Sequence, residues 1–157
     1  MDEYLLLKTA HILSSTLLFG TGLGTAFHGF MANRSGDLAA RRIVNRNVVI
    51  ADWLFTTPAV ILQPVTGVWL ARIAGYPLTT DWLAVAIVLY LFVGACWLPV
   101  VGIQIEMRRI VDRLADGEGL PARYFTLSRT WFLLGWPAFA GVLAIFWLMV
   151  AKPDFAW

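Results

Sequence analysis

The sequence predicts an all-α integral membrane protein that folds as a bundle of four transmembrane helices. Three observations lead to this class. Of the 157 residues, 59% are hydrophobic and 14% are charged, whereas soluble domains are about 45–50% apolar and about 25% charged. Four long apolar stretches follow one another, each near or above the roughly 20 residues that cross a bilayer core. Basic residues gather in two of the segments between these stretches.

The predicted spans cover approximately residues 4–31, 48–73, 82–105 and 131–151. No Pro/Gly/Ser-rich linker or low-complexity run separates them, so residues 1–157 are expected to form one domain. A cleaved signal peptide is not expected, because Met1, Asp2 and Glu3 are not basic and the first apolar run is too long. The first span should therefore remain in the mature protein.

The third span is expected to continue beyond the membrane as a helix. Arg108 and Asp112 can pair at i, i+4. The segment "ADGEGLP" at 115–121 predicts the end of this helix and the start of the next. One helical face carries the apolar residues Ile103, Met107, Ile110 and Leu114.

Orientation follows from the basic residues, which accumulate in short cytoplasmic loops. Nine of the twelve lie after the first or the third span: Arg34, Arg41, Arg42, Arg46, Arg108, Arg109, Arg113, Arg123 and Arg129. Both termini are therefore expected in the periplasm, and the protein in a bacterial inner membrane.

One set of polar side chains is expected at a common depth, about 10 Å into the membrane from the periplasmic side. We call this set the His11 layer. Polar residues inside lipid are costly, so each is a candidate for function. The layer consists of His11, Gln63, Thr66 and Tyr90, with Lys8 one turn above His11 and Arg72 near the rim.

Two interpretations of His11 remain open. In the first, Gln63 or Tyr90 satisfies His11 in a hydrogen bond between helices. In the second, His11 is an axial ligand to a haem or a metal, and Lys8 or Arg72 pairs with haem propionates near the surface.

A second polar set is expected near the cytoplasmic face. Asp52 in the first turn of a helix fits simple capping electrostatics, so one interpretation is a charge network that fixes the helix ends. The other is a second cofactor or proton-entry site with His28 as a ligand. The set holds His28, Asp52, Thr56, Gln104 and Glu106, bordered by Arg46 and Arg129.

Several function classes are excluded by composition and spacing. A formal charge of +2 is too small to indicate a nucleic-acid-binding protein, and the single cysteine, Cys96, cannot form a disulfide within one chain. No zinc-ligand spacing or nucleophile elbow is present. His11 and His28 lie 17 residues apart on one helix, or about 25 Å, so they cannot ligate the same iron. Any haem needs one histidine plus another ligand, an open position, or a histidine from a second subunit.

Two segments carry a resemblance to a known family. The opening "YLLLKTAHIL" at 4–13 and "TTPAVILQPVTGVWL" at 56–70 resemble a bacterial family of four-helix predicted integral membrane proteins of unknown function. That family is similar to the copper-resistance-D-like group, which includes the HemJ-type protoporphyrinogen oxidase, whose first helix carries a similar Lys-x-x-His.

The resemblance implies a b-type haem within the bundle, with His11 and Lys8 at the positions of the family histidine and lysine. HemJ-like proteins have a second histidine further along the first helix than His28, so His28 does not match it. The specific oxidation reaction is therefore not carried over.

Two functional hypotheses follow. The first is a haem b protein with a redox or electron-transfer role, a membrane oxidoreductase in which His11 binds iron. The second is a non-catalytic accessory or scaffold subunit of a larger membrane complex or homo-oligomer. The small size of the chain fits both.

Overall fold

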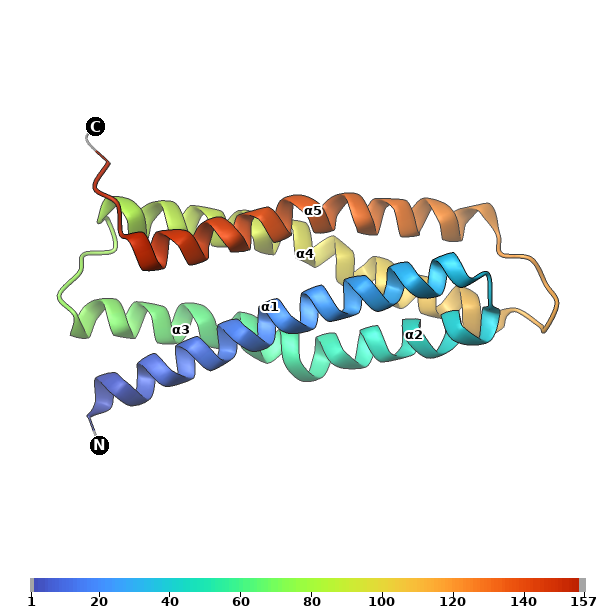
Figure 1. The fold of residues 1–157 in the computed structure, drawn as a ribbon, viewed down its shortest axis with the longest axis horizontal. Coiled ribbons are helices and arrows are strands. Elements are labelled where there is room, and N and C mark those ends of the chain that lie inside the picture. Colours follow the sequence, from blue (N-terminus) through green and yellow to red (C-terminus); the bar gives the residue numbers. More distant parts are fainter. Residues whose placement is uncertain (1, 156–157) are drawn as a thin grey trace.

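A computed structural model describes residues 2–155, and every element in this part is helical (Figure 1). Helices α2 and α3 join through the π-helical turn η1, so four long helical segments result, and the predicted all-α class is confirmed. The elements are α1 (Glu3–Ser35), α2 (Leu38–Ala51), η1 (Asp52–Thr56), α3 (Thr57–Ile73), α4 (Asp81–Arg113) and α5 (Ala122–Ala151).

Three of these segments are long and apolar enough to cross a membrane: Leu38–Ile73, Asp81–Arg113 and Ala122–Ala151. Helix α1 is not among them, because Lys8, His11 and a series of hydroxyl and glycine residues lower its mean hydropathy. Many large apolar side chains point outward, including Leu13, Val88 and Trp136. Such a surface suits lipid rather than water.

The two ends of the bundle differ. Both termini lie beside the α3–α4 loop, and we call this the terminal end (Figure 1). The opposite end holds the α1–α2 and α4–α5 connections, and we call it the arginine-rich end after the basic residues that surround these connections.

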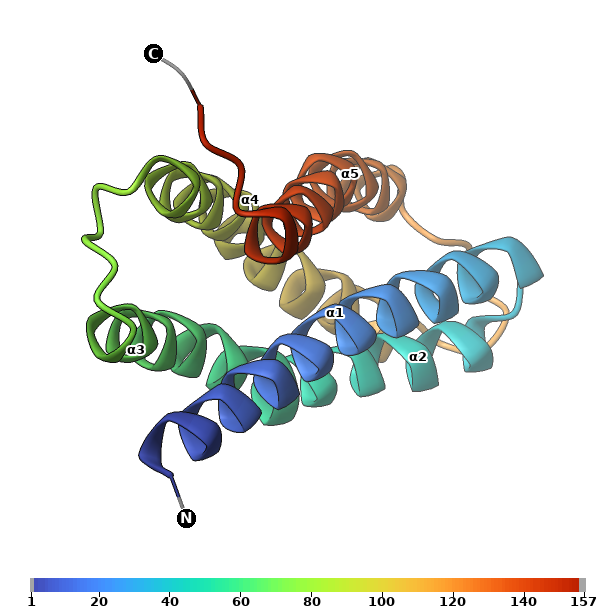
Figure 2. The ribbon, with the colours of Figure 1, turned by 60° about the vertical axis from the view of Figure 1, so that its left-hand side comes forward.

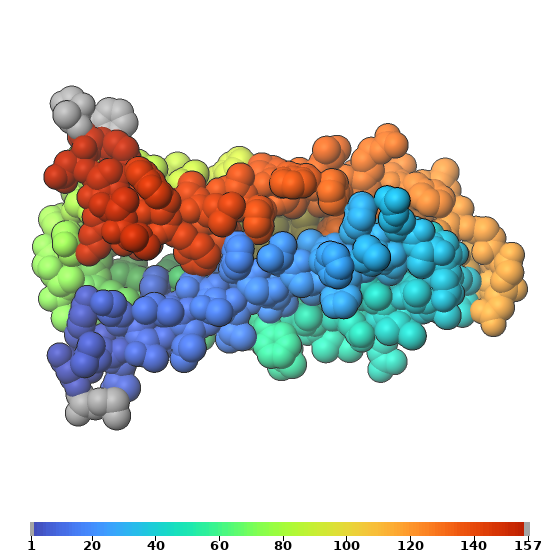
Figure 3. All heavy atoms as spheres, in the orientation of Figure 1, coloured from blue at the N-terminus to red at the C-terminus, as the bar shows by residue number. Residues whose placement is uncertain are grey.

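The helices pack as two pairs that diverge toward the terminal end. Helix α4 packs against α5, whereas α1 packs against α3 in its first half and against α2 in its second. Helix α2 contacts α4, whereas the backbones of α1 and α5 stay apart over most of their length and meet through side chains, such as Phe19 with Phe139 and Asn33 with Ser128. Figure 2 shows the α1/α3 pair apart from the α4/α5 pair, and Figure 3 shows α1 (blue) and α5 (red) well separated at the terminal end.

Packing is tightest at two clusters that lie toward opposite ends of the bundle. The cluster toward the terminal end contains Ala71, Trp82, Leu83, Ala86 and Leu148. The cluster toward the arginine-rich end contains Met107, Val111 and Tyr124. The segments of the helices between these clusters surround a cavity, which is described below.

Helix α2 begins ten residues before the predicted second span. Residues 38–47 were expected to be loop, but Asp37 caps a helix there by accepting a hydrogen bond from the backbone N–H of Ala39 at 2.8 Å. Gly36, at φ 76°, ends α1 in the left-handed conformation that glycine favours. The chain therefore reverses within two residues.

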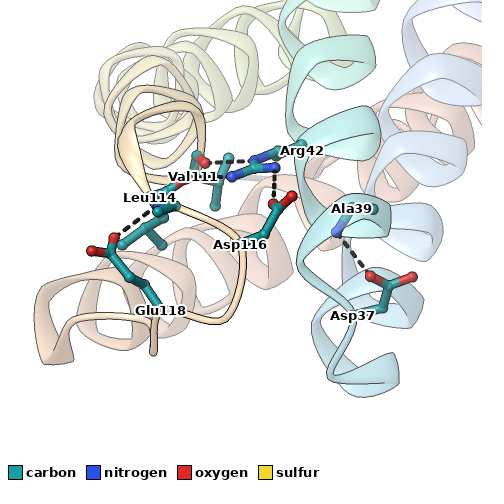
Figure 4. Close-up of polar contacts among 8 residues, drawn as sticks. Asp37, Ala39, Arg42, Val111, Leu114, Asp116 and Glu118 are labelled. Carbon is teal, nitrogen blue, oxygen red and sulfur yellow. Dashed lines mark hydrogen bonds and ion pairs between the residues drawn. The ribbon is translucent and has the colours of Figure 1, made fainter.

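The predicted helical extension of the third span is confirmed, because α4 continues to Arg113. The expected i, i+4 pair is also present, with Arg108 Nε 3.5 Å from Asp112 Oδ2. Two consecutive arginines of α2 close this end of the bundle. Arg41 donates to the carbonyls of Asn33 and Gly36 at the end of α1, and Arg42 donates to carbonyls at the end of α4 (Figure 4).

Gly67 and Gly141 lie where neighbouring helices approach each other closely. The closest approach is at Gly141 of α5, where a Cβ would lie 2.7 Å from Val93 Cγ2 of α4. A Cβ at Gly67 of α3 would lie 3.2 Å from the His11 ring.

Candidate functional site

His11 is held by a side chain of the facing helix. Its Nδ1 lies 2.8 Å from Thr66 Oγ1, and the Thr66 hydroxyl donates its proton to the Leu62 carbonyl at 2.6 Å. When the hydroxyl proton is used on Leu62, the Thr66 oxygen accepts from the imidazole. In this arrangement the proton of a neutral His11 is on Nδ1, and Nε2 keeps its lone pair.

Gln63 adds a second link between α1 and α3. Its Nε2 donates to the His11 carbonyl at 2.7 Å and to Ser14 Oγ at 2.5 Å. The structure thus brings His11, Gln63 and Thr66 together, as their predicted depth suggested. The hydrogen-bond partner of the imidazole, however, is Thr66 and not Gln63 or Tyr90.

Tyr90 has a different role from the one expected. Its hydroxyl donates to the Val60 carbonyl of α3. In an unbroken α-helix this carbonyl would accept from the N–H of residue 64, but that residue is Pro64, which has none. Tyr90 therefore satisfies a carbonyl that a proline leaves open inside the membrane.

Tyr90→Phe is expected to lower the free energy of unfolding by about 1 kcal/mol, since it leaves the Val60 carbonyl unpaired in a lipid-embedded bundle. In a Pro64→Ala background the restored backbone N–H can bond to this carbonyl, so the same change should cost less. A double-mutant cycle from unfolding in detergent measures the difference. Strictly additive effects would show that the two residues do not share this carbonyl.

Lys8 and Arg72 lie outside the His11 layer, on the surface. Lys8 is exposed, with its Nζ 5.7 Å from the centre of the Tyr4 ring. Arg72 is exposed beside Trp69 and Ile73. Neither forms an ion pair within residues 2–155.

A cavity of about 350 Å³ lies inside the bundle, between the two pairs of helices. Its lining starts at Ser15 and Gln63, one helical turn from His11, and extends to Asp52 and Gln104. His11, Lys8 and Arg72 are not in this lining. Most of the wall is apolar and aromatic, with Phe19, Trp97, Trp131, Phe139 and Phe146 among its residues.

The polar residues toward the arginine-rich end of this cavity come from the second predicted set. Asp52 is 5% exposed, and its Oδ1 accepts a hydrogen bond from Thr56 Oγ1 at 2.8 Å. Gln104 is buried and also lines the cavity. His28 is exposed beside Phe27 and does not line it.

Other members of that set lie apart from the cavity. Glu106 pairs with Arg123 at 3.1 Å and with Arg109 at 3.8 Å. Among the described residues, Glu106 is therefore the one member of the predicted set in an ion pair, and its partners are arginines outside that set.

Sequence reasoning missed Trp97, whose buried Nε1 has no hydrogen-bond partner. Its spacing from Val100 and Gln104, at i, i+3 and i+7, could have placed it on the same helix face as the buried glutamine.

Within the described residues there is no group of three or more His, Cys, Asp or Glu side chains that could hold a metal ion. No curated protein and no solved structure matches the chain significantly. A family model does match, over residues 5–153, and its description is "Predicted integral membrane protein (DUF2269)". The match covers nearly the whole chain, and the protein belongs to this family of integral membrane proteins of unknown function.

Proposed function

We propose that this membrane protein binds a b-type haem with His11 as an axial ligand and serves in electron transfer. The observation that carries the proposal is the hydrogen bond between His11 Nδ1 and Thr66. A histidine that ligates a metal commonly donates its other ring N–H to a fixed acceptor, which sets the tautomer and the ring orientation. Thr66 acts in this way, and Nε2 has no hydrogen-bond partner among residues 2–155.

The donor set fits haem better than a bare metal ion. A porphyrin supplies four nitrogen ligands, so the protein needs to supply only one or two. A single well-oriented imidazole is therefore enough, whereas a zinc site needs three or four protein ligands. When bound, the haem would supply one-electron chemistry.

The surroundings of His11 are also suitable. The absence of a side chain at Gly67 leaves room for the imidazole against α3, where a Cβ would lie 3.2 Å from its Cε1. Lys8 and Arg72, which lack carboxylate partners in the described residues, remain available for propionates. The resemblance of the first two spans to the HemJ-containing group supports the same ligand.

The proposed topology has four spans, with α1 as the fourth and both termini in the periplasm of a bacterial inner membrane. Both termini lie at one end of the bundle, and basic residues surround the connections at the other (Figure 1). In a Cys96→Ser background, cysteines at Asp2 and Thr79 should react with an impermeant thiol reagent added to spheroplasts, whereas a cysteine at Asp116 should not. The reverse labelling pattern would refute the orientation.

The haem proposal is tested by the visible spectrum of protein purified in detergent from cells supplied with haem. Wild type and His28→Ala are expected to show a Soret band, and His11→Ala is expected to lose it. Thr66→Val should keep the fold but weaken or shift the band, because the imidazole loses its acceptor. A colourless wild-type protein that copurifies with a stoichiometric partner would favour the accessory-subunit hypothesis and overturn this one.

A further inference from the structure

Two buried polar atoms at the cavity wall lack partners. They are Oδ2 of Asp52, on η1, and Nε1 of Trp97, on α4. Both residues line the cavity. An unpaired buried donor or acceptor destabilises a folded protein, so each such atom needs an explanation.

Asp52 is the first residue of the π-helical turn η1 and lines the cavity. The backbone N–H of Thr57 bonds to the Asp52 carbonyl five residues earlier, and Pro58 follows directly. Thr56 donates to Oδ1 of Asp52, the side chain of Gln104 lies close to the same carboxyl group, and Oδ2 has no hydrogen-bond partner. Such π-helical turns within α-helices are frequent at functional sites.

The two atoms without partners restrict which functional groups a ligand can place beside them. The carboxylate oxygen calls for a donor, and the indole N–H calls for an acceptor. A hydroxyl group supplies both. An ammonium group supplies only donors and would leave Trp97 unpaired, and a carboxylate supplies only acceptors and would repel Asp52.

The rest of the cavity limits the shape of the ligand. Aromatic side chains such as Phe19, Trp131 and Phe139 line the wall, and they suit a flat ring packed by stacking or edge contacts. Asp52 is eleven residues from Gln63, or about 16 Å along the helix, so Asp52 lies well away from His11. The cavity is therefore mostly apolar, with Asp52 and Gln104 at one end and Ser15 and Gln63 at the other.

We propose that the cavity wall that carries Asp52 and Trp97 binds the hydroxylated head group of a membrane hydroquinone, with the rest of the molecule in the apolar cavity. One ring hydroxyl donates to Asp52 Oδ2, and a ring oxygen accepts from Trp97 Nε1. The site does not depend on haem at His11. His11→Ala should bind hydroquinone as well as wild type does.

The test is isothermal titration of the purified protein in phosphatidylcholine nanodiscs with decylubiquinol under anaerobic conditions. Saturable binding to wild type is expected. Asp52→Asn keeps an acceptor for Thr56 but removes the carboxylate, and Trp97→Phe removes the indole N–H. Each should weaken binding about tenfold, the equivalent of one hydrogen bond. Trp53→Phe is the matched control, because Trp53 is 60% exposed and does not line the cavity.

A second probe separates head-group recognition from simple partitioning into an apolar space. The dimethyl ether of decylubiquinol retains the ring and the chain but has no hydroxyl donor, so it should bind wild type at least tenfold more weakly. Unchanged affinity for the ether, or unchanged affinity in folded Asp52→Asn and Trp97→Phe proteins, would overturn the proposal. So would Asp52-dependent binding of dodecylammonium without binding of decylubiquinol.

Discussion

Gly141→Ala is expected to lower the free energy of unfolding by about 1–3 kcal/mol relative to the matched change Gly135→Ala. Gly141 is buried where α5 crosses α4, and a Cβ there would lie 2.7 Å from Val93 Cγ2. The β-branched side chain of Val93 has few alternative rotamers, so the contact cannot relax by a simple rotation. The two helices would have to separate along the most extensive interface in the bundle.

Gly135 is a suitable control because it lies in the same helix and a Cβ there would meet no atom within 4 Å. Both changes gain the roughly 1 kcal/mol by which alanine exceeds glycine in helix propensity, so the difference between them reports the steric term. Unfolding in detergent followed by circular dichroism provides the measurement. Adding Val93→Ala should remove most of the penalty at Gly141, and a penalty that persists in that background would contradict the steric account.

The parts of the fold that follow from average hydropathy could be predicted from the sequence. The apolar runs located the long helices, and the i, i+4 pair of Arg108 and Asp112 showed that α4 continues beyond the apolar segment. Helix α2 was missed because it is short and basic. Its stability comes from the Asp37 cap and from the burial of Arg41, Val48 and Val49 against neighbouring helices.

The candidate site, too, could be predicted from the sequence only in part. Depth along each helix correctly grouped His11 with Gln63 and Thr66, since helices of similar pitch bring residues of equal depth together. Depth does not give rotation about the helix axis, so the choice of Thr66 as the partner of the imidazole could not be predicted. The contact of Tyr90 with Val60 also depends on rotation about the helix axis, so it could not be predicted either.

The cavity itself could not be read from the sequence. It arises because the backbones of α1 and α5 stay apart and the two helix pairs diverge toward the terminal end, and both features depend on contacts between segments distant in the chain. The tightest contact at a glycine is at Gly141, where a Cβ would lie 2.7 Å from Val93 Cγ2. Gly141 is a single glycine whose contact, Val93, lies on another helix, so no sequence pattern within α5 marks this position.

Arg42→Ala is expected to lower the free energy of unfolding by about 2 kcal/mol. The guanidinium of Arg42 donates through Nε to the Val111 carbonyl at 3.0 Å, and through a second nitrogen to the Leu114 carbonyl (Figure 4). These are among the last carbonyls of α4, which have no partner within the helix. A positive charge at this position also interacts favourably with the helix dipole.

The ion pair made by the same side chain is expected to matter little. Arg42 Nη1 lies 2.8 Å from Asp116, but the carboxylate is 92% exposed, so water screens the interaction. Asp116→Ala should therefore leave the unfolding transition nearly unchanged. Hydrogen exchange in the last turn of α4 should accelerate in Arg42→Ala and not in Asp116→Ala. Equal effects of the two substitutions would mean that the ion pair, rather than capping of α4, is what joins α2 to α4.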